Sequence, residues 1–545
     1  MTIHRILPLC LSLAVLFPAG ASLAQEKPLP PAAAFKDKRV PDRAARERSA
    51  PSVAEGKSQS LSDSSTQVLL LSMLRNSSYQ LSKASSVLLL QQDMGKRISI
   101  STLRYRTENG KYRPYQEAEH SKTANFTAEG GKQTDKMLLW GSFSYSNSKL
   151  DSIRWGHRKD AAFTTPFYYG SQRAVHYQQT DYAIQTHLMH RLAKGLSASI
   201  SSDYGMGDHF STNDPRALLK HFKLRLSPAL QWQNKQIGLE IRGLWGYGQQ
   251  ESQVDYRNKE YYESSQYPEY LNWLINGYGT MRNALSFSDR VYTNNQDFSG
   301  GGLAFFYKAK GWTGRLNLSY ERIHEEYDRG NSSGRYDGYD MYGDYDVDQW
   351  KGYLDLQEAQ QRWGLRLEAA QSKGKDYNID LLGNNYAALR RMAALALYYR
   401  LPIWGRHTEF SFRETLSYRN QVDGNMLIQR EAGRQQANIQ LRHALSKQQH
   451  QLLELGLGYS SPYSTAFSQS PRSSNAFIDQ VIKNDVALDK TNYWQLQAGF
   501  QQYFRFAGMN WMAHAQTMQL QAPRSDEVLQ GRARNQTNLS LHLYF

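Results

Sequence analysis

Cysteine and long apolar runs are nearly absent from this chain, and each absence excludes a class of protein. The one cysteine, Cys10, lies inside an N-terminal segment that we expect to be cleaved. A mature chain without thiols has no disulfide framework, no thiolate catalysis and no cysteine-ligated zinc or iron–sulfur centre. Beyond that segment there is no run of about 18 apolar residues, so no helix is expected to span a membrane.

Proline is also scarce, whereas aromatic residues reach 12% and include 36 tyrosines. Tyrosine and tryptophan favour β-strands and the two interfaces of a membrane. The net charge of +15 is compatible with nucleic-acid binding, but the chain has no helix-turn-helix, zinc or RNA-binding signature. We interpret the basic excess as a surface that faces anionic lipid head groups, and we expect no nucleic-acid partner.

The first part of the chain divides into three segments. Residues 1–24 have a short basic start, an apolar stretch and a Ser-Leu-Ala cleavage site, which together predict a signal peptide. Residues 25–62 are rich in proline, charge and serine and are predicted to be a disordered periplasmic leader. Residues 63–96 contain two leucine-rich stretches and are predicted to form either a short helix or a hatch at the mouth of a barrel. Periodicity does not separate these two alternatives.

From residue 97 to the end, apolar and polar residues alternate in segment after segment. In the last one, Leu539, Leu541 and Leu543 share one face, while the residues between them are polar. Such a strand suits a barrel whose outer face meets lipid and whose inner face meets water. The terminal Phe545 resembles the C-terminal signal by which outer-membrane barrels are recognised for insertion.

The connections between these segments alternate in length. The long ones are predicted near residues 107–118, 150–173, 208–218, 257–297, 327–346, 376–385, 421–428, 462–488 and 522–531. Short turns lie between them, and the alternation gives roughly 18 strands, an even number that leaves both chain termini in the periplasm. The sequence therefore predicts an all-β fold over residues 97–545, a transmembrane antiparallel outer-membrane β-barrel with long extracellular loops and short periplasmic turns.

Several short motifs resemble a known family. They are RNSS at 75–78, ANFTAEGG at 124–131, WGSFSY at 140–145, PFYY at 166–169 and NDPR at 213–216. With them the chain resembles the outer-membrane barrel family named domain of unknown function 6850, over nearly all of its mature length. The resemblance implies a Gram-negative outer-membrane location and a setting beside energy-coupled uptake receptors. It brings no catalytic residues with it.

The first candidate site is the predicted lumen, where twelve charged residues fall on inward faces. They are Lys223, Arg225, Glu240, Arg242, Arg315, Glu321, Lys351, Asp355, Arg366, Glu368, Glu409 and Arg413. Such residues either line a polar permeation path or pair across neighbouring strands and brace the barrel. We favour bracing, because both signs of charge are intermixed.

The second candidate site is the predicted loop 258–295, the longest connection. Its aromatic residues are Tyr261, Tyr262, Tyr267, Tyr270, Trp273, Tyr278 and Phe287. Long loops in compact folds are usually functional. This one is expected either to fold into the pore as a plug or to dock a partner at the cell surface, and the sequence leaves both alternatives open.

A third segment, 337–348, is rich in aspartate, tyrosine and glycine. Its spacing is not that of a twelve-residue calcium loop, and the expected terminal glutamate is missing. We therefore predict a solvated acidic loop and no metal site.

Signs of enzyme chemistry are weak. His187 and His190 are three positions apart on a predicted strand, so they face opposite sides and cannot share a metal ion. Met512, His514 and Met518 share an inward face, which packing and polar lining explain. No nucleophile elbow or phosphate-binding loop occurs.

We therefore expect no enzymatic activity and no cofactor. The function predicted from the sequence is solute uptake in the outer membrane, either as a channel or as an accessory docked to an energy-coupled uptake receptor. The expected partners are outer-membrane lipid and either such a receptor or a surface lipoprotein. The alternative is an outer-membrane hydrolase with a serine, a histidine and an acid at the extracellular rim, which geometry has to reveal.

Overall fold

The computed structural model describes residues 82–90, 97–159, 165–263, 266–284, 290–329, 341–446, 450–523 and 531–544. The predicted signal peptide (1–24) and periplasmic leader (25–62) lie outside the described residues. Of the predicted helix or hatch (63–96), only 82–90 is described in front of the first strand. Among the described residues, no helix is long and apolar enough to cross a bilayer.

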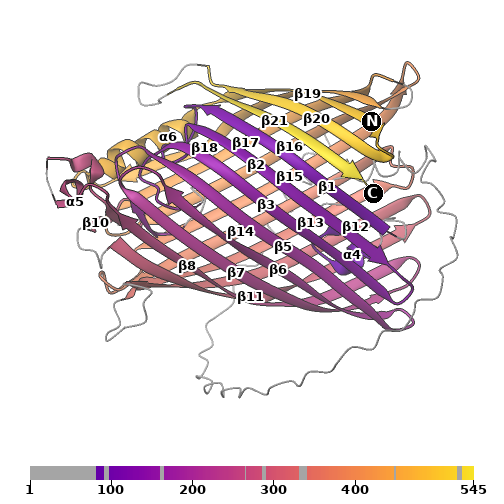
Figure 1. The fold of residues 1–545 in the computed structure, drawn as a ribbon, viewed down its shortest axis with the longest axis horizontal. Coiled ribbons are helices and arrows are strands. Elements are labelled where there is room, and N and C mark those ends of the chain that lie inside the picture. Colours follow the sequence, from indigo (N-terminus) through magenta and orange to yellow (C-terminus); the bar gives the residue numbers. More distant parts are fainter. Residues whose placement is uncertain are drawn as a thin grey trace, which may run out of the picture. The chain divides into compact units, whose positions relative to one another are not determined.

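Eighteen long strands form one antiparallel sheet in which each strand pairs with its neighbours in the chain (Figure 1). They are β1 (Arg97–Gly110), β2 (His120–Gln133), β3 (Met137–Ile153), β5 (Val175–Ala193), β6 (Leu196–Ser211), β7 (Arg216–Gln233), β8 (Ile237–Asp255), β11 (Val291–Ala309), β12 (Trp312–Arg329), β13 (Met341–Glu358), β14 (Trp363–Asn378), β15 (Tyr386–Ile403), β16 (Arg406–Asp423), β17 (Ile428–Ala444), β18 (Gln451–Gln469), β19 (Tyr493–Phe506), β20 (Met509–Gln521) and β21 (Ala533–Tyr544).

The sheet closes on itself because the last strand pairs with the first. Leu541 of β21 lies opposite Leu103 of β1, and the ladder continues along both strands. Closure removes the two free edges that an open sheet would have. The predicted fold is confirmed: this is a closed antiparallel barrel of eighteen strands, of the outer-membrane type.

Each strand has an apolar outer face and a polar inner face, as β12 illustrates. Leu318 points outward and its side chain is 43% exposed, whereas Arg315 and Asn317 point inward and are buried. Aromatic pairs mark the two ends of the apolar stretch. Trp312 contacts Trp363 at a centroid distance of 4.2 Å, and Tyr320 contacts Trp350 at 4.6 Å. This arrangement is typical of the aromatic girdles of membrane barrels.

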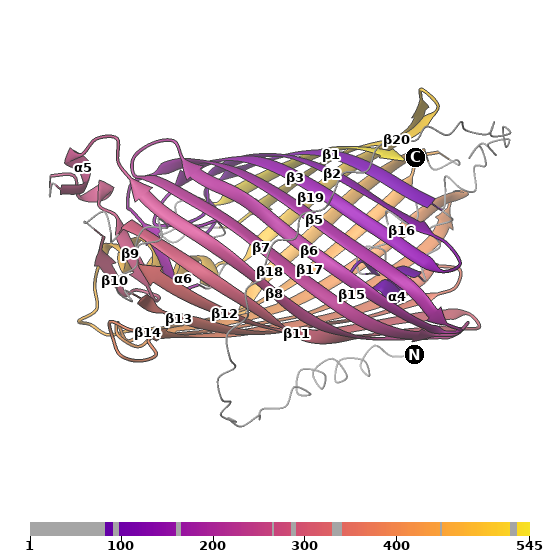
Figure 2. The ribbon, with the colours of Figure 1, turned by 60° about the horizontal axis from the view of Figure 1, so that its bottom comes forward.

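The two ends of the barrel differ. At one end the strands are joined by short turns such as 134–136, 234–236 and 310–311, and the other end carries the long connections (Figure 2). We call them the turn end and the loop end. Strand β21 finishes at the turn end, beside the start of β1.

The strands reach further toward the loop end than the sequence predicts. The predicted loop 327–346 is shorter, since β12 continues to Arg329 and β13 begins at Met341. Of the predicted acidic loop 337–348, residues 341–348 therefore belong to β13, while 330–340 lie outside the described residues. The prediction was wrong here because beyond the apolar band both faces of a strand are polar. Hydrogen bonding continues where the alternation of residue types has already ended.

A short helix, α4 (Ser86–Leu90), lies inside the barrel near the turn end. The N–H of Val87 donates to Oε2 of Glu240 on β8 at 3.0 Å. Val87 and Leu88 pack with Phe306 and Tyr353 in a small buried apolar cluster. Gly238 allows this contact, because a Cβ there would lie 2.9 Å from Cγ2 of Val87.

Substitution of neighbouring residues on β12 tests which face meets lipid. We expect Leu318→Arg to destabilise the barrel by about 2–4 kcal/mol, because it places a charge on the apolar band. Ser319→Arg, one residue further on the inner face, serves as the matched control and is expected to cost much less. Urea titration of refolding into phosphatidylcholine vesicles, followed by heat-modifiable electrophoretic mobility, measures both. Equal costs for the two variants would contradict the assignment of faces.

Candidate functional site

Three long connections fold together at the loop end of the barrel. Their described elements are β4 (Phe167–Gly170) from 154–174; α5 (Glu260–Glu263), η3 (Pro268–Tyr270), β9 (Trp273–Asn276) and β10 (Met281–Asn283) from 256–290; and η5 (Ile478–Ile482) and α6 (Lys483–Lys490) from 470–492. Strand β9 pairs with both β4 and β10, so two distant loops share one three-stranded sheet. We call this assembly of three loops the loop plug.

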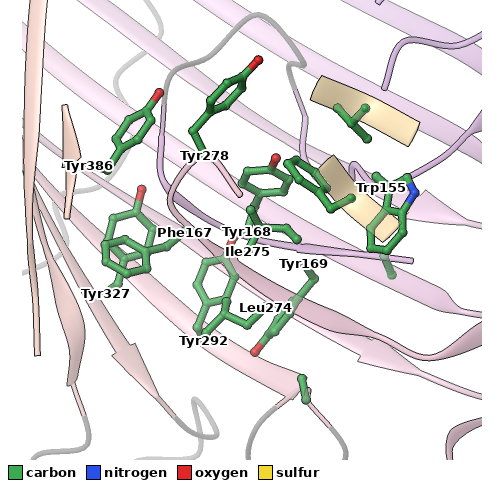
Figure 3. Close-up of a cluster of buried hydrophobic side chains, with 14 of the residues drawn as sticks. Trp155, Phe167, Tyr168, Tyr169, Leu274, Ile275, Tyr278, Tyr292, Tyr327 and Tyr386 are labelled. Atoms are coloured by element: carbon green, nitrogen blue, oxygen red, sulfur yellow. The ribbon is translucent and has the colours of Figure 1, made fainter. Parts of the chain in front are cut away.

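The loop plug is joined to the barrel wall by a core rich in aromatic residues (Figure 3). Trp155 packs edge-on against Phe477 at a centroid distance of 5.6 Å, which connects the first loop to the third. Tyr169 of β4 packs against Tyr292 of the wall strand β11 at 5.1 Å. Aromatic contacts of this kind contribute about 0.5–1.5 kcal/mol each beyond the burial of area. The loop plug is therefore a packed core with its own sheet.

Buried ion pairs hold helix α6 to strand β17. Arg430, only 2% exposed, pairs through Nη1 with Asp485 at 2.9 Å and through Nε with Asp489 at 2.7 Å. The same Nη1 donates to the hydroxyl of Tyr278 at 2.7 Å, which ties in the second loop. Arg419 of β16 also pairs with Asp489.

The C-terminal end of α6 is held by a second arginine. Nη2 of Arg434 donates to the carbonyl oxygens of Leu488 at 2.9 Å, Asp489 at 3.1 Å and Thr491 at 3.0 Å. These carbonyl groups lie at the end of the helix, where the negative end of the helix dipole favours a cation.

A buried carboxylate fixes the second loop. Asp423 at the end of β16 is fully buried and accepts the N–H of Tyr278 at 2.7 Å, the N–H of Thr280 at 2.9 Å and the hydroxyl of Thr280 at 2.7 Å. A Cβ at Gly277 would lie 2.4 Å from Oδ2 of Asp423, so glycine is required for this approach.

A histidine is buried where the first loop meets the wall. Nδ1 of His157 contacts the hydroxyl of Tyr177, and its Nε2 lies 3.2 Å from Oγ of Ser171. Burial lowers the pKa of His157 to about 3, and the charge of His209 adds to this effect. In the second loop, burial raises the pKa of Tyr278 well above its ordinary value. Both side chains are therefore neutral at pH 7.

All twelve predicted lumen residues lie on the inner face, and ten of them form ion pairs. The pairs are Arg315–Asp355 (3.0 Å), Arg366–Asp355 (3.0 Å), Arg225–Glu321 (3.0 Å), Arg242–Glu240 (3.2 Å), Arg413–Glu368 (2.8 Å), and Glu409 with Arg400 (2.6 Å) and Arg442 (3.0 Å). Lys223 and Lys351 form no ion pair among the described residues. All of these pairs except Arg242–Glu240, which lies within β8, join different strands, which is what bracing of the wall requires. The inward glycines of β18 do not open a path, since a Cβ at Gly458 would lie 2.2 Å from Oδ1 of Asn438.

The predicted aromatic loop lies largely in the loop plug, and its last residues, 291–295, belong to β11. Tyr261 stacks on Tyr270 at 4.0 Å, with Tyr267 edge-on to both. Trp273 is on β9 and packs against the core. Tyr278 is buried against Arg430, which places it inside the loop plug. The side chain of Tyr262 lies outside the described residues.

The sequence prediction missed the residues that lock the loop plug, namely Arg419, Asp423, Arg430, Arg434, Asp485 and Asp489. Residues 462–488 were predicted to be one loop, although β18 continues to Gln469 and two helices follow. A signal is present in the sequence: Phe477, Ile478, Val481 and Ile482 recur at helical spacing. Asp485 and Asp489 are also one helical turn apart, which places both on one side of α6.

One group of described residues has the composition of a metal site. Potential ligand atoms of His324, Glu326 and Asp344 lie within 4.8 Å of one another on the outer side of β12 and β13. His324 contacts Asp346 at 2.9 Å and Glu326 at 3.4 Å. Each ring nitrogen of His324 thus already contacts a carboxylate.

No contact among the described residues joins a serine, a histidine and an acid in a chain. Ser171 contacts His157, but the other nitrogen of that imidazole contacts Tyr177, and Ser171 is fully buried. His187 contacts Ser201 at 2.5 Å and Ser86 at 3.4 Å, with no carboxylate on its ring. The geometry of these described residues does not provide a hydrolase site.

Comparison with known proteins assigns the chain to a family. Residues 87–545 match the model of the "Family of unknown function (DUF6850)". The chain belongs to this family. No curated protein matches it.

Several solved barrels are similar in fold. The siderophore receptor PiuA from Acinetobacter baumannii has 10% identity and a TM-score of 0.41, covering 83% of this chain and 82% of that one. The FrpB iron transporter from Neisseria meningitidis has 9% identity and a TM-score of 0.41, covering 83% and 81%. The outer membrane transporter YddB from Escherichia coli has 9% identity and a TM-score of 0.34, covering 82% and 80%. At these values the likeness says nothing about activity.

Removal of the central arginine is expected to loosen the loop plug. Arg430→Gln leaves Asp485 buried without its guanidinium, which costs about 3 kcal/mol or more. Hydrogen exchange measured by mass spectrometry is therefore expected to accelerate by at least tenfold in residues 470–492. Lys483→Gln, which removes only an exposed pair with Asp479, is the control and should leave exchange unchanged. Exchange in Arg430→Gln as slow as in the wild type would show that α6 is held by other contacts.

Acid is expected to weaken the loop plug through His157. The ordinary pKa is 6.5 and the folded value about 3, so between these values the unfolded loop binds a proton that the folded loop cannot. The contribution of His157 to the free energy of unfolding is fully present above pH 6.5 and is lost as the pH falls toward 3. The measurement is hydrogen exchange of residues 165–174 at pH 7 and at pH 5, corrected for the intrinsic exchange rate at each pH. The opening free energy obtained in this way should depend less on pH in His157→Asn than in the wild type. The same slope in both proteins would exclude His157 as the source.

Proposed function

We propose that this protein is an outer-membrane barrel for solute uptake, whose path is closed at the loop end by its own loop plug. The observation that carries the proposal is the attachment of α6. Arg419, Arg430 and Arg434 of the wall hold it, through side chains and not through a strand ladder. A segment held in this way can leave without breaking the barrel, because no hydrogen bond between wall strands is lost.

The inner wall supports the same proposal. A barrel with eighteen strands is wide enough to enclose a channel or a plugged lumen. Charged groups of the wall pair with one another, as in Arg315–Asp355–Arg366 across three adjacent strands, so the wall keeps its shape when the interior is empty of protein. The elements that occupy the interior at the two ends are the loop plug and α4.

The alternative within uptake is an accessory role, in which the barrel docks to an energy-coupled receptor or a surface lipoprotein and passes nothing itself. It differs from the channel in one measurable respect, since a docking scaffold has no path to open. The hydrolase alternative gains no support from the contacts described above.

Planar-bilayer recordings of the purified protein distinguish the channel from the scaffold. The intact barrel is expected to be closed most of the time. The double variant Asp485→Asn/Asp489→Asn removes both carboxylate charges that pair with Arg430. It is expected to raise the fraction of time in the open state at least tenfold. Replacement of residues 471–490 by a short Gly-Ser linker is expected to give steady conductance.

The control is Lys483→Gln, which alters the charge of the same helix without changing the ion pairs of Arg430 and Arg419. Silence in every variant, with each shown to be folded by heat-modifiable mobility, would overturn the channel and leave the docking scaffold. Steady conductance in the intact protein would show instead that the loop plug leaves a path open.

A further inference from the structure

The inner wall beneath α6 carries two arginines directly opposite each other. Arg390 of β15 and Arg419 of β16 are partners in the antiparallel ladder. Arg390 is on the same face of β15 as the buried Tyr386 and Ala388, while the exposed Arg391 points outward. Directly opposed residues have Cα atoms about 4.5–5.5 Å apart. Like charges at such a position destabilise a sheet, so the presence of two arginines here calls for a compensating interaction.

The carboxylates nearby do not neutralise this group. Asp489 is shared by Arg419 and Arg430, and Asp485 pairs with Arg430. Arg434 donates to carbonyl oxygens and to Oγ of Ser460. The four guanidiniums of Arg390, Arg419, Arg430 and Arg434 thus share two carboxylates, which leaves a surplus of two positive charges.

Arg390 is the member without a partner. In the described part of the chain it forms no hydrogen bond and no ion pair, and it is half-buried in the lumen. Carboxylates on the inner face are occupied: Glu368 pairs with Arg413, and Asp376 accepts the N–H groups of Asn385 and Tyr386. Oδ2 of Asp376 accepts no hydrogen bond among the described residues, but neither of these carboxylates forms an ion pair with Arg390.

The wall next to this pair is smooth and carries a further cation. Ser372 of β14 is the ladder partner of Arg390, and Ala370 follows on the same face. Ala370 is in turn the partner of Lys351 on β13, whose side chain is exposed. On β14 only the small side chains of Ser372 and Ala370 lie between Arg390 and Lys351, with Met392 of β15 beside them, so one solute can reach both cations.

We propose that Arg390 and Arg419 bind an anionic group, a carboxylate or a phosphate, of a solute inside the lumen, with Lys351 as a second contact for a multivalent anion. A guanidinium presents parallel N–H donors that match the two oxygens of such a group. An anion between the two arginines removes their repulsion. The inference rests on the proposed uptake function, for which it names the substrate class as anionic.

The test is isothermal titration calorimetry of the full-length protein in neutral detergent, at constant ionic strength, with citrate and inorganic phosphate as probes. Arg390→Gln is expected to weaken citrate and phosphate binding by about tenfold or more, the loss of one charge-assisted contact. Lys351→Gln is expected to weaken citrate several-fold and to leave phosphate unchanged. Arg104→Gln, which removes a lumen-facing cation on the distant strand β1, is the control and should bind as the wild type does.

Folding is followed separately. Without anion, Arg390→Gln is expected to unfold at the same or a higher temperature than the wild type, because it removes a repulsive pair. Wild-type affinity in Arg390→Gln, equal losses in Arg390→Gln and Arg104→Gln, or no saturable heat in the wild type would each overturn the proposal.

The outcome is separable from that of the bilayer experiment. If the variants with a released loop plug conduct but the wild-type protein does not bind citrate, only the proposed anion site is overturned. A protein that binds citrate through Arg390 but never conducts would overturn the channel alone.

Discussion

Closure of the ladder between β1 and β21 is the constraint on which the rest of the structure depends. A strand edge left open in lipid has N–H and C=O groups without partners, each at a cost of several kcal/mol, and pairing of the last strand with the first removes both edges. Once the sheet is closed, the period-two alternation sends each residue to lipid or to the lumen. Leu541 and Ser540 are adjacent in the chain but face opposite environments. The interior of so wide a barrel then has to be filled or left wet, and α4, the paired charges and the loop plug are the ways in which this chain fills it.

Buried arginine–carboxylate pairs serve two different purposes in the barrel. Arg315, Asp355 and Arg366 join strands that backbone hydrogen bonds already hold together, so their ion pairs add rigidity to a wall that exists without them. Arg430 with Asp485 and Asp489 joins a strand to a helix that has no ladder to the wall. The chemistry is the same, but only the second set decides whether a part of the molecule stays in place. A buried pair contributes little net stability compared with apolar packing, yet it is costly to break on one side.

The sequence predicted the barrel, the number of strands and the inward position of the lumen charges, because all three follow from alternation along single strands and from the lengths of connections. It did not predict where the strands end, as Glu326 and Asp344 show, since alternation stops at the edge of the apolar band while pairing continues. It also did not predict the loop plug. Asp423 binds Thr280 and Arg430 binds Asp485 across long stretches of chain, and no local pattern encodes which distant loops meet. Within 470–492 the helical spacing of Phe477 to Ile482 can be recognised in the sequence. The contact of Phe477 with Trp155 cannot.

The sequence separation of the loop plug's contacts sets an order of events in assembly. Nε1 of Trp155 donates to Oε1 of Gln480 across 325 positions of the chain. The four wall strands β5, β6, β7 and β8 separate β4 from its partner β9 in the sequence. Contacts between such distant segments form late, because the chain between them has to be ordered first. We therefore expect the wall to close before the loop plug folds, so that assembly passes through a stage in which the lumen has no loop plug. For the uptake channel that we propose, such a stage would be a leak that lasts as long as the three loops take to fold.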